Sequence, residues 1–143
     1  MIKQTCYRSL SNSGPDMRVL AMFRDILAVS ERNNSARGIT GYLLFDRHVF
    51  AQVLEGEAGA VDAAFSRIRA DRRHSEVTLL GSRERRDRQF AKWSMGGATI
   101  GALGDREILL RHGLEAEGWQ RKLDAPGLIA VALDFAARHL PRR

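Results

Sequence analysis

The chain has 143 residues, of which 44% are hydrophobic and 28% are charged, a length and composition typical of one globular domain. No apolar run approaches the roughly 18 residues that a membrane-spanning helix needs, and the N-terminal segment lacks the apolar core of a secretion signal. A cytoplasmic protein without a membrane anchor is therefore expected. The single cysteine, Cys6, excludes an internal disulfide and a thiolate zinc cluster, and we expect it to be a small buried side chain.

The net charge of +6 raises nucleic acid as a partner, because basic patches bind phosphate backbones. The basic excess is concentrated in residues 82–92 and in the last residues of the chain, and acidic residues are mixed into the first of these segments. No basic strand rich in aromatic residues accompanies them. We therefore interpret residues 82–92 as a solvated loop and disfavour nucleic acid as a partner.

The hydrophobic pattern predicts an alternation of strands and helices. Strands are predicted at residues 2–9, 39–45, 48–54, 75–84 and 90–101. Helices are predicted at residues 17–32, about 61–70, 105–114 and 126–140. Asn33, Asn34, Ser35 and Gly38 are expected to end the first helix, and Asp62 to lie near the positive N-terminus of the second.

The order β-α-β-β-α-β is that of a split βαβ unit, in which both helices cover one face of an antiparallel-rich sheet. We therefore expect an α+β fold with strands one and three as central neighbours and with an extra fifth strand. The two C-terminal helices are expected to cover the other face of the sheet or to contact a partner subunit.

Motifs for catalysis are missing from the sequence. There is no Walker loop, and the glycines of residues 96–104 lack the spacing of a dinucleotide fingerprint. The four histidines are scattered, and no nucleophile has an evident base nearby. We expect no enzymatic activity.

Uncharged polar residues gather on the predicted sheet and at the end of the first helix, and they include an amide, Gln52, in the middle of an apolar strand. The set comprises Tyr7, Ser9, Asn33, Asn34 and Gln52, with Trp93 and Met95 two residues apart on the fifth strand. Tyr7 and Gln52 can be adjacent on the helix-covered face, because strands one and three are neighbours. Buried polar groups need partners, and a planar ligand with donors and acceptors along one edge would supply them.

Five motifs in order carry a family resemblance: the SERNN helix end, GITG, FAQVLEG, the residues from Arg67 to His74, and WSM. Over roughly residues 1–100 the chain resembles the BLUF family, blue-light sensors that use FAD. The resemblance implies a ferredoxin-like sandwich with the flavin between the two helices. FMN or riboflavin could fill the same site, because all three share the isoalloxazine ring.

The resemblance also implies roles for individual residues. Asn34 would bind the pyrimidine edge of the flavin, and Gln52 would connect the flavin N5 and O4 edge to the Tyr7 hydroxyl. After blue-light excitation Tyr7 lends an electron and a proton, and Gln52 returns with rearranged hydrogen bonds that shift the flavin absorption to the red. The implied cofactor-binding residues are Tyr7, Ile26, Ser30, Asn33, Asn34, Gln52, Arg67 and Asp71, and the implied signalling residues are Trp93 and Met95.

Purely structural roles remain open for most of these residues. Tyr7 could be a buried tyrosine with a backbone partner, and Gln52 an edge-strand amide facing water. Asn34 could be only a helix cap, and Arg67 and Asp71 only a surface ion pair. Ile26, Trp93 and Met95 could be ordinary core side chains.

We expect residues 1–100 to form the flavin-binding domain and residues 101–143 a helical cap that serves output or oligomerisation. The chain looks like the short, stand-alone type of the family. We expect it to form a homo-oligomer and to signal to an unidentified downstream protein partner. Two alternatives remain open. One is a light-insensitive ferredoxin-like module that binds nucleic acid or a small ligand. The other is a member that binds FAD but whose first strand, with Cys6 and Arg8, prevents the photochemistry.

Overall fold

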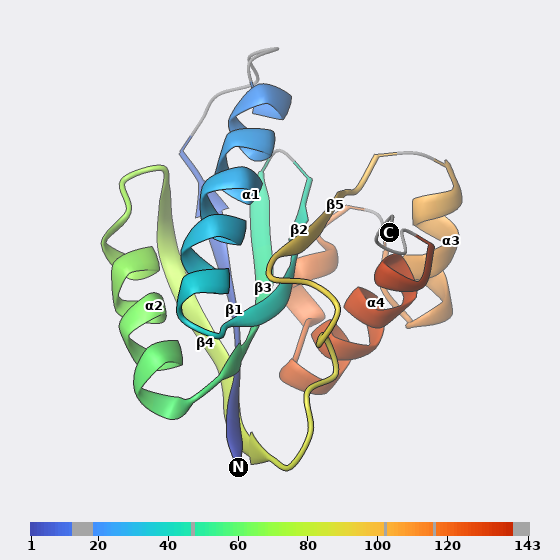
Figure 1. The fold of residues 1–143 in the computed structure, drawn as a ribbon. Helices are drawn as coiled ribbons and strands as arrows, with labels where there is room; N and C mark the ends of the chain where they lie inside the picture. Colours follow the sequence, from blue (N-terminus) through green and yellow to red (C-terminus); the bar gives the residue numbers. More distant parts are fainter. Residues whose placement is uncertain (13–18, 47, 102, 116, 139–143) are drawn as a thin grey trace.

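The computed structural model describes residues 1–12, 19–46, 48–101, 103–115 and 117–138. Its first part comprises β1 (Ile2–Ser11), α1 (Val19–Ala36), β2 (Thr40–Phe45), β3 (Val49–Gly56), α2 (Ala58–Ala70) and β4 (His74–Arg85). The second part comprises β5 (Gly96–Thr99), α3 (Leu103–Arg111), the short 3-10 helix η1 (Trp119–Lys122) and α4 (Ala125–Arg138) (Figure 1). None of the helices within these ranges combines the length and the apolarity that crossing a membrane requires.

The five strands form one sheet in the order β4-β1-β3-β2-β5. The first four are antiparallel to their neighbours, and β5 runs parallel to β2. This is the predicted split βαβ arrangement with its extra strand, and β1 and β3 are neighbours at its centre, as expected. The β1–β3 register places Tyr7 directly opposite Gln52.

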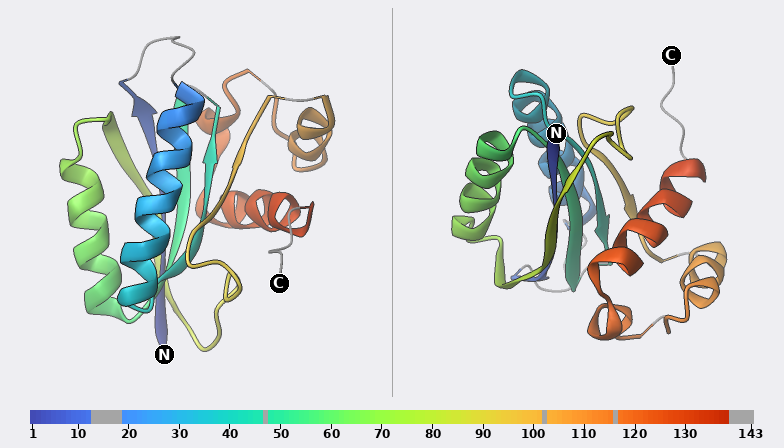
Figure 2. Two further views of the ribbon diagram at one scale, coloured as in Figure 1. Left: turned by 45° about the horizontal axis from the view of Figure 1, so that its top comes forward. Right: turned by 90° about the horizontal axis from the view of Figure 1, so that it is seen from below.

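The sheet separates two hydrophobic cores. Helices α1 and α2 lie on one face, and α4 lies on the other, as the view along the sheet shows (Figure 2). Phe23 of α1 stacks on Phe45 of β2 in the first core, with ring centroids 5.3 Å apart. Leu128 and Phe135 of α4 are fully buried in the second core, and each such side chain stabilises the fold by about 2 kcal/mol. The C-terminal helices therefore cover the second face, which was one of the two expectations.

The ends of the first two helices differ from the prediction. Helix α1 continues through Ala36, so Asn33 and Asn34 lie within its last turn and do not end it. Gly38 ends it, because its φ of +67° is a conformation that glycine adopts without strain. Helix α2 begins earlier than predicted, because the Glu57 carboxylate accepts hydrogen bonds from the first free backbone N–H groups of the helix. Asp62 lies outside the first turn and pairs with Lys3 at 2.7 Å.

The fifth strand is shorter than predicted, and Trp93 and Met95 are not part of it. Parallel pairing of β5 with β2 begins only at Gly96, opposite Tyr42. Before that point the chain turns, since the Trp93 N–H donates to the Phe90 carbonyl at 3.1 Å and the Trp93 carbonyl accepts from the Gly41 N–H at 3.0 Å. Apolar residues alternate there because Trp93 packs against the α4 core and Met95 against the core beneath α1 and α2, and not because they form a strand.

Residues 82–92 are not the simple solvated loop that their charges suggested. Residues 82–85 belong to β4, and Phe90 is fully buried. Boundaries elsewhere shift by up to three residues: α3 ends at Arg111, and η1 was not predicted. The predicted start of the first helix at residue 17 and the end of the last at residue 140 lie outside the described residues.

Candidate functional site

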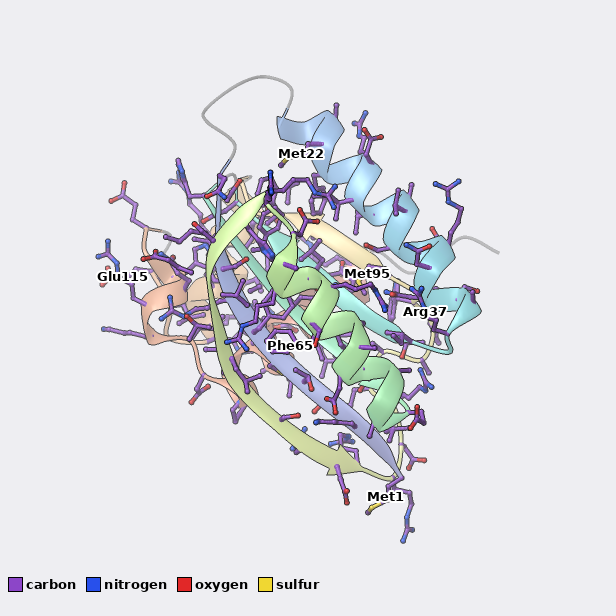
Figure 3. All side chains as sticks on the ribbon, turned by 90° about the vertical axis from the view of Figure 1, so that its left-hand side faces the viewer. Met1, Met22, Arg37, Phe65, Met95 and Glu115 are labelled. Carbon is purple, nitrogen blue, oxygen red and sulfur yellow. The ribbon has the colours of Figure 1, made fainter. Side chains whose placement is uncertain are left out.

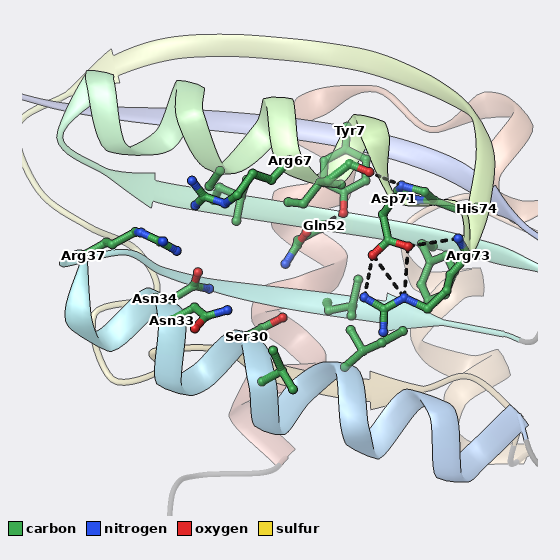
Figure 4. A pocket seen from close by; sticks show the side chains of 17 residues that line it. Tyr7, Ser30, Asn33, Asn34, Arg37, Gln52, Arg67, Asp71, Arg73 and His74 are labelled. Atoms are coloured by element: carbon green, nitrogen blue, oxygen red, sulfur yellow. Dashed lines mark hydrogen bonds and ion pairs between the residues drawn. The ribbon is translucent and has the colours of Figure 1, made fainter.

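A cavity of about 210 Å³ lies between α1 and α2, with the sheet as its floor. Helices α1 and α2 lie over the same face of the sheet (Figure 3). Residues of both helices line the cavity together with residues of β1, β2 and β3 (Figure 4). All eight residues that the sequence proposed for a cofactor line this one cavity: Tyr7, Ile26, Ser30, Asn33, Asn34, Gln52, Arg67 and Asp71.

Tyr7 and Gln52 are hydrogen-bonded to each other on the cavity floor. They are 3% and 4% exposed, and the Tyr7 hydroxyl donates to the Gln52 Oε1 atom. The other end of the amide, Nε2, donates to Met95 Sδ at 3.1 Å. The alternatives in which Tyr7 has a backbone partner and Gln52 faces water are therefore wrong. The three side chains form a continuous hydrogen-bonded chain.

The environment of Tyr7 keeps its phenol protonated. Burial raises the pKa of Tyr7 far above its usual value, and the negative charge of Asp71 raises the pKa further. The ring lies 5.5 Å from the Phe65 ring and edge-on to His74 at 6.4 Å. Tyr7 is thus a neutral hydrogen-bond donor in an aromatic surrounding.

Asn34 is buried, at 7% exposure, and its side chain lines the cavity. Its backbone carbonyl accepts from the Arg37 and Ile39 N–H groups at 3.0 and 2.8 Å, which closes the helix end. The side-chain amide has no hydrogen-bond partner in the described parts of the chain, so it is available to a ligand. Asn33 is exposed and lies at the rim.

Apolar side chains complete the cavity and would suit a flat ring. They come from both helices and from the sheet, and are Ile26, Leu43, Phe50, Leu54 and Ile68. Ile26 and Ile68 also pack against the core beneath the helices, so the structural role left open for Ile26 and a binding role are compatible.

Arginines surround the mouth of the cavity. Arg73 binds Asp71 through its Nη2 atom at 2.5 Å and its Nε atom at 3.0 Å, and these hydrogen bonds hold the pKa of the Asp71 carboxyl below its usual value. The ion pair suggested between Arg67 and Asp71 is therefore wrong. Arg37 and Arg67 line the cavity without an acidic partner within the described ranges. The mouth favours an anionic group.

Sequence reasoning missed several residues of this site. His74 lines the cavity, its Nδ1 atom within 2.7 Å of the Ser9 hydroxyl and its Nε2 atom bonded to the Ile68 carbonyl. Arg37 and Arg73 were also missed. Ser9 could have indicated His74, because it lies on the same strand face as Tyr7 and a buried hydroxyl there needs a hydrogen-bond partner on a neighbouring strand.

The proposed signalling residues lie on opposite sides of the sheet. Met95 is buried in the core beneath α1 and α2, where it contacts Gln52. Trp93 is half-buried against the α4 core, with its ring edge-on to Tyr42 at 5.9 Å. Only Met95 reaches the cavity floor through a described contact.

Comparisons with known proteins identify a family for this chain. The family model described as "BLUF: Sensors of blue-light using FAD" matches residues 2–96. Photoactivated adenylate cyclase subunit beta of Euglena gracilis is 36% identical over 75 residues, which are 52% of this chain and 9% of that protein. The photo-activated state of BlsA is 26% identical, with a TM-score of 0.84 over 100% of both chains. The dark state of BlrB, a BLUF protein, is 29% identical, with a TM-score of 0.74 over 97% of each chain.

The matched range contains every residue that lines the cavity, and the fold is that of the solved relatives. The chain spans no more than 10% of the length of the curated relatives it matches. Family membership favours the photoreceptor reading over the light-insensitive binding module. This chain belongs to the BLUF family, the sensors of blue light that use FAD.

Proposed function

We propose that the chain is a light-controlled binding module in which Tyr7 and Gln52 form the photoactive pair. The observation that carries this proposal is the hydrogen-bonded chain from the Tyr7 hydroxyl through the Gln52 amide to Met95 on the floor of the cavity. A rearrangement of the Gln52 amide changes the hydrogen bonds of both Tyr7 and Met95. A sensor that signals without chemical turnover requires such a change in hydrogen bonds.

The residues present fit FAD. The buried Asn34 amide, which has no side-chain hydrogen bond among the described residues, offers both a donor and an acceptor to a ring edge. The apolar walls suit the faces of an isoalloxazine, and Arg37 and Arg67 at the mouth would bind phosphates. FMN has the same ring and a phosphate, so the cavity also suits FMN.

Bound FAD would supply blue-light absorption and an excited state that accepts an electron. Tyr7 would be the donor, because a buried phenol that loses an electron becomes a strong acid, and the Gln52 Oε1 atom already accepts its hydrogen bond. Its proton moves to Gln52, and the return of the electron and the proton restores the tyrosine. Gln52 is left rotated or tautomerised, with its hydrogen bonds changed.

The output is a contact with another polypeptide. We infer that residues 101–143 provide it, either to a second copy of the chain or to a downstream protein in the cytoplasm. Two features support this inference. The similarity to BlsA extends over the whole chain, and the Trp119 Nε1–H donates to Asp46 Oδ2 at 2.5 Å, which connects the cap to the turn between β2 and β3.

The visible spectrum of the purified protein, recorded in the dark and directly after blue illumination, tests the proposal. A flavin spectrum that shifts to the red and relaxes in darkness is expected. Flavin without a shift would refute the roles of Tyr7 and Gln52 and would indicate that the first strand prevents the photochemistry. A protein that cannot be reconstituted with FAD would refute the cavity assignment as well.

A further inference from the structure

Met95 reaches Gln52 from an irregular segment, residues 86–95, which joins β4 to β5. The Gln52 amide donates to the Met95 sulfur at 3.1 Å, and Met95 is buried. What the nitrogen end of the Gln52 amide contacts therefore depends on where the 86–95 segment lies.

A buried carboxylate fastens this segment to the sheet. Glu55 on β3 is 0% exposed. Its Oε2 atom accepts from the Gln89 N–H at 2.8 Å, and its Oε1 atom accepts from the Phe90 N–H at 2.7 Å. A fully buried acid is rare unless its oxygens are satisfied, and here the main satisfying groups are backbone donors of the segment itself.

Gln4 supports the Glu55 carboxylate from the neighbouring strand. It is also buried and lies opposite Glu55 in the β1–β3 register. Its Nε2 atom donates to Glu55 Oε2 and to Gln89 Oε1, both at 2.9 Å, and its Oε1 atom accepts from Arg83 Nε at 2.7 Å. Three strands and the segment thus share one polar network.

Arg88 provides a second attachment from within the segment. Its guanidinium donates to three acceptors around the start of β2 and the end of β3: Thr40 Oγ1 at 2.9 Å, the Gly38 carbonyl at 2.6 Å and the Glu55 carbonyl at 3.2 Å. Arg88 thus attaches the segment to the sheet independently of the Glu55 carboxylate.

The same two strands carry the photoactive pair and the attachment. Tyr7 lies opposite Gln52, and Gln4 lies opposite Glu55 three positions away. Side chains three positions apart on a strand point to opposite faces. The Gln52 amide therefore lies on one face of the β1–β3 pair, and the Glu55 carboxylate that attaches the segment lies on the other. Met95 connects the two, because it belongs to the segment and contacts Gln52.

We propose that Glu55 is a positioning residue of the light response: its carboxylate holds the backbone of Gln89 and Phe90, and this keeps Met95 against Gln52. The proposal rests on the proposed function of Gln52. Because Glu55 acts through the segment, its removal changes the behaviour of Gln52 without removing any group that binds the flavin.

Amide hydrogen exchange in darkness tests the attachment directly. Glu55→Gln keeps the size of the side chain but directs an NH₂ donor at a backbone N–H donor. The backbone N–H groups of Gln89 and Phe90 are expected to exchange faster than in the parent protein, while the dark flavin spectrum is retained. Glu57→Gln is the matched control, since Glu57 also accepts from two backbone N–H groups, both at 3.0 Å, but these belong to Gly59 and Ala60 at the start of α2. Unchanged protection of Gln89 and Phe90 in Glu55→Gln would overturn the proposal.

A double-mutant cycle on the dark-recovery rate tests the connection to Gln52. Met95→Ala is expected to change the rate in the parent protein and to have a smaller effect in Glu55→Gln, because loss of the Glu55 carboxylate loosens the contact between Met95 and Gln52. For two independent sites, the rate change in the double mutant equals the product of the two single-mutant rate changes to within about twofold. A double mutant that agrees with this product would refute the positioning role.

Failure of the proposed function is distinguishable from failure of this inference. A parent protein that binds flavin but shows no light-induced shift would refute the former, and the exchange experiment would still decide whether Glu55 holds the segment. If Glu55→Gln does not fold, Glu55→Asp takes its place, because a carboxylate that is one methylene shorter keeps the charge but cannot keep both hydrogen bonds to the Gln89 and Phe90 N–H groups; the same loss of protection and the same loss of coupling to Met95 are expected.

Discussion

Gln52 lies between apolar neighbours on a buried strand, where an unsatisfied amide would cost about 1 to 3 kcal/mol. It is tolerated because Tyr7 donates to its oxygen and Met95 accepts from its nitrogen. A leucine would fit the strand equally well and would remove both hydrogen bonds. The amide is therefore explained by its chemistry and not by the packing of the strand.

We predict that Gln52→Leu retains flavin and loses the light-induced red shift, because the rearranging group is gone while Asn34 and the apolar walls remain. Dark and light difference spectra measure this outcome. Gln120→Leu on η1 is the control with the same chemical change far from the cavity, and its shift should equal that of the parent. A shift of normal size in Gln52→Leu would contradict the assignment.

The two tyrosines of the chain, Tyr7 and Tyr42, should both resist alkali. Burial raises the pKa of both, to about 12 for Tyr42 and further for Tyr7. When the folded-state pKa of a group is raised, its full contribution to stability is present at any pH below the unfolded-state pKa, which is near 10 for tyrosine. The contribution is lost as the pH rises from there toward the folded-state pKa. The light-induced shift should therefore persist through pH 10 (about the ordinary tyrosine value), with no tyrosinate absorbance until the protein unfolds. Titration of the shift with a midpoint near 10 would contradict it.

Helix α2 carries Arg67 to the cavity, Asp71 follows directly after its last residue, and its first turn depends on one N-terminal capping residue. The Glu57 carboxylate accepts from the Gly59 and Ala60 N–H groups, both at 3.0 Å. We predict that Glu57→Ala lowers the free energy of unfolding by about 1 kcal/mol, as typical for loss of a cap. Urea unfolding measures the change.

Asp62→Ala on the same helix is the control for that prediction. Asp62 pairs with Lys3 at 2.7 Å, but its side chain is largely exposed, and exposed ion pairs contribute at most about 1 kcal/mol and commonly far less. The loss in Asp62→Ala should be smaller than in Glu57→Ala. Equal losses would mean that the Glu57 hydrogen bonds do not stabilise the helix start.

Periodicity predicted the order of the elements and the Tyr7–Gln52 contact, because strand alternation and the split βαβ arrangement are local and topological properties. It placed Trp93 and Met95 on a strand, because apolar alternation cannot reveal that β2 offers a partner only from Gly96 onward. Glu55 could not be predicted either. Besides the Gln4 side chain, its partners are two backbone N–H groups that lie 34 and 35 residues further along the chain, and backbone groups leave no trace in side-chain identity.

At the scale of the whole molecule, the sheet joins two cores, and neither is complete without it. Tyr7 and Leu43 face the helices of the cavity, while Cys6 and Leu44, their neighbours in sequence, face α4. The pKa of the Cys6 thiol is raised to about 12, mainly by burial, so it acts as an apolar side chain on the α4 face. The cap and the cavity thus share strands, and a change in one core alters the free energy of the other.

We therefore predict that the cap and the flavin site unfold together. Phe135→Ala removes a fully buried ring of α4 and should cost about 3 to 5 kcal/mol, whereas Leu110→Ala on exposed α3 surface should cost little. In a Trp93→Phe background, Trp119 fluorescence reports the cap and flavin absorbance reports the cavity. Both signals should change at the same urea concentration, and Phe135→Ala should move both midpoints down equally. Two separate transitions, or a midpoint shift confined to the Trp119 signal, would mean that residues 101–143 form an independent unit. The light-induced change at the flavin site would then have to reach these residues through a contact other than the shared strands.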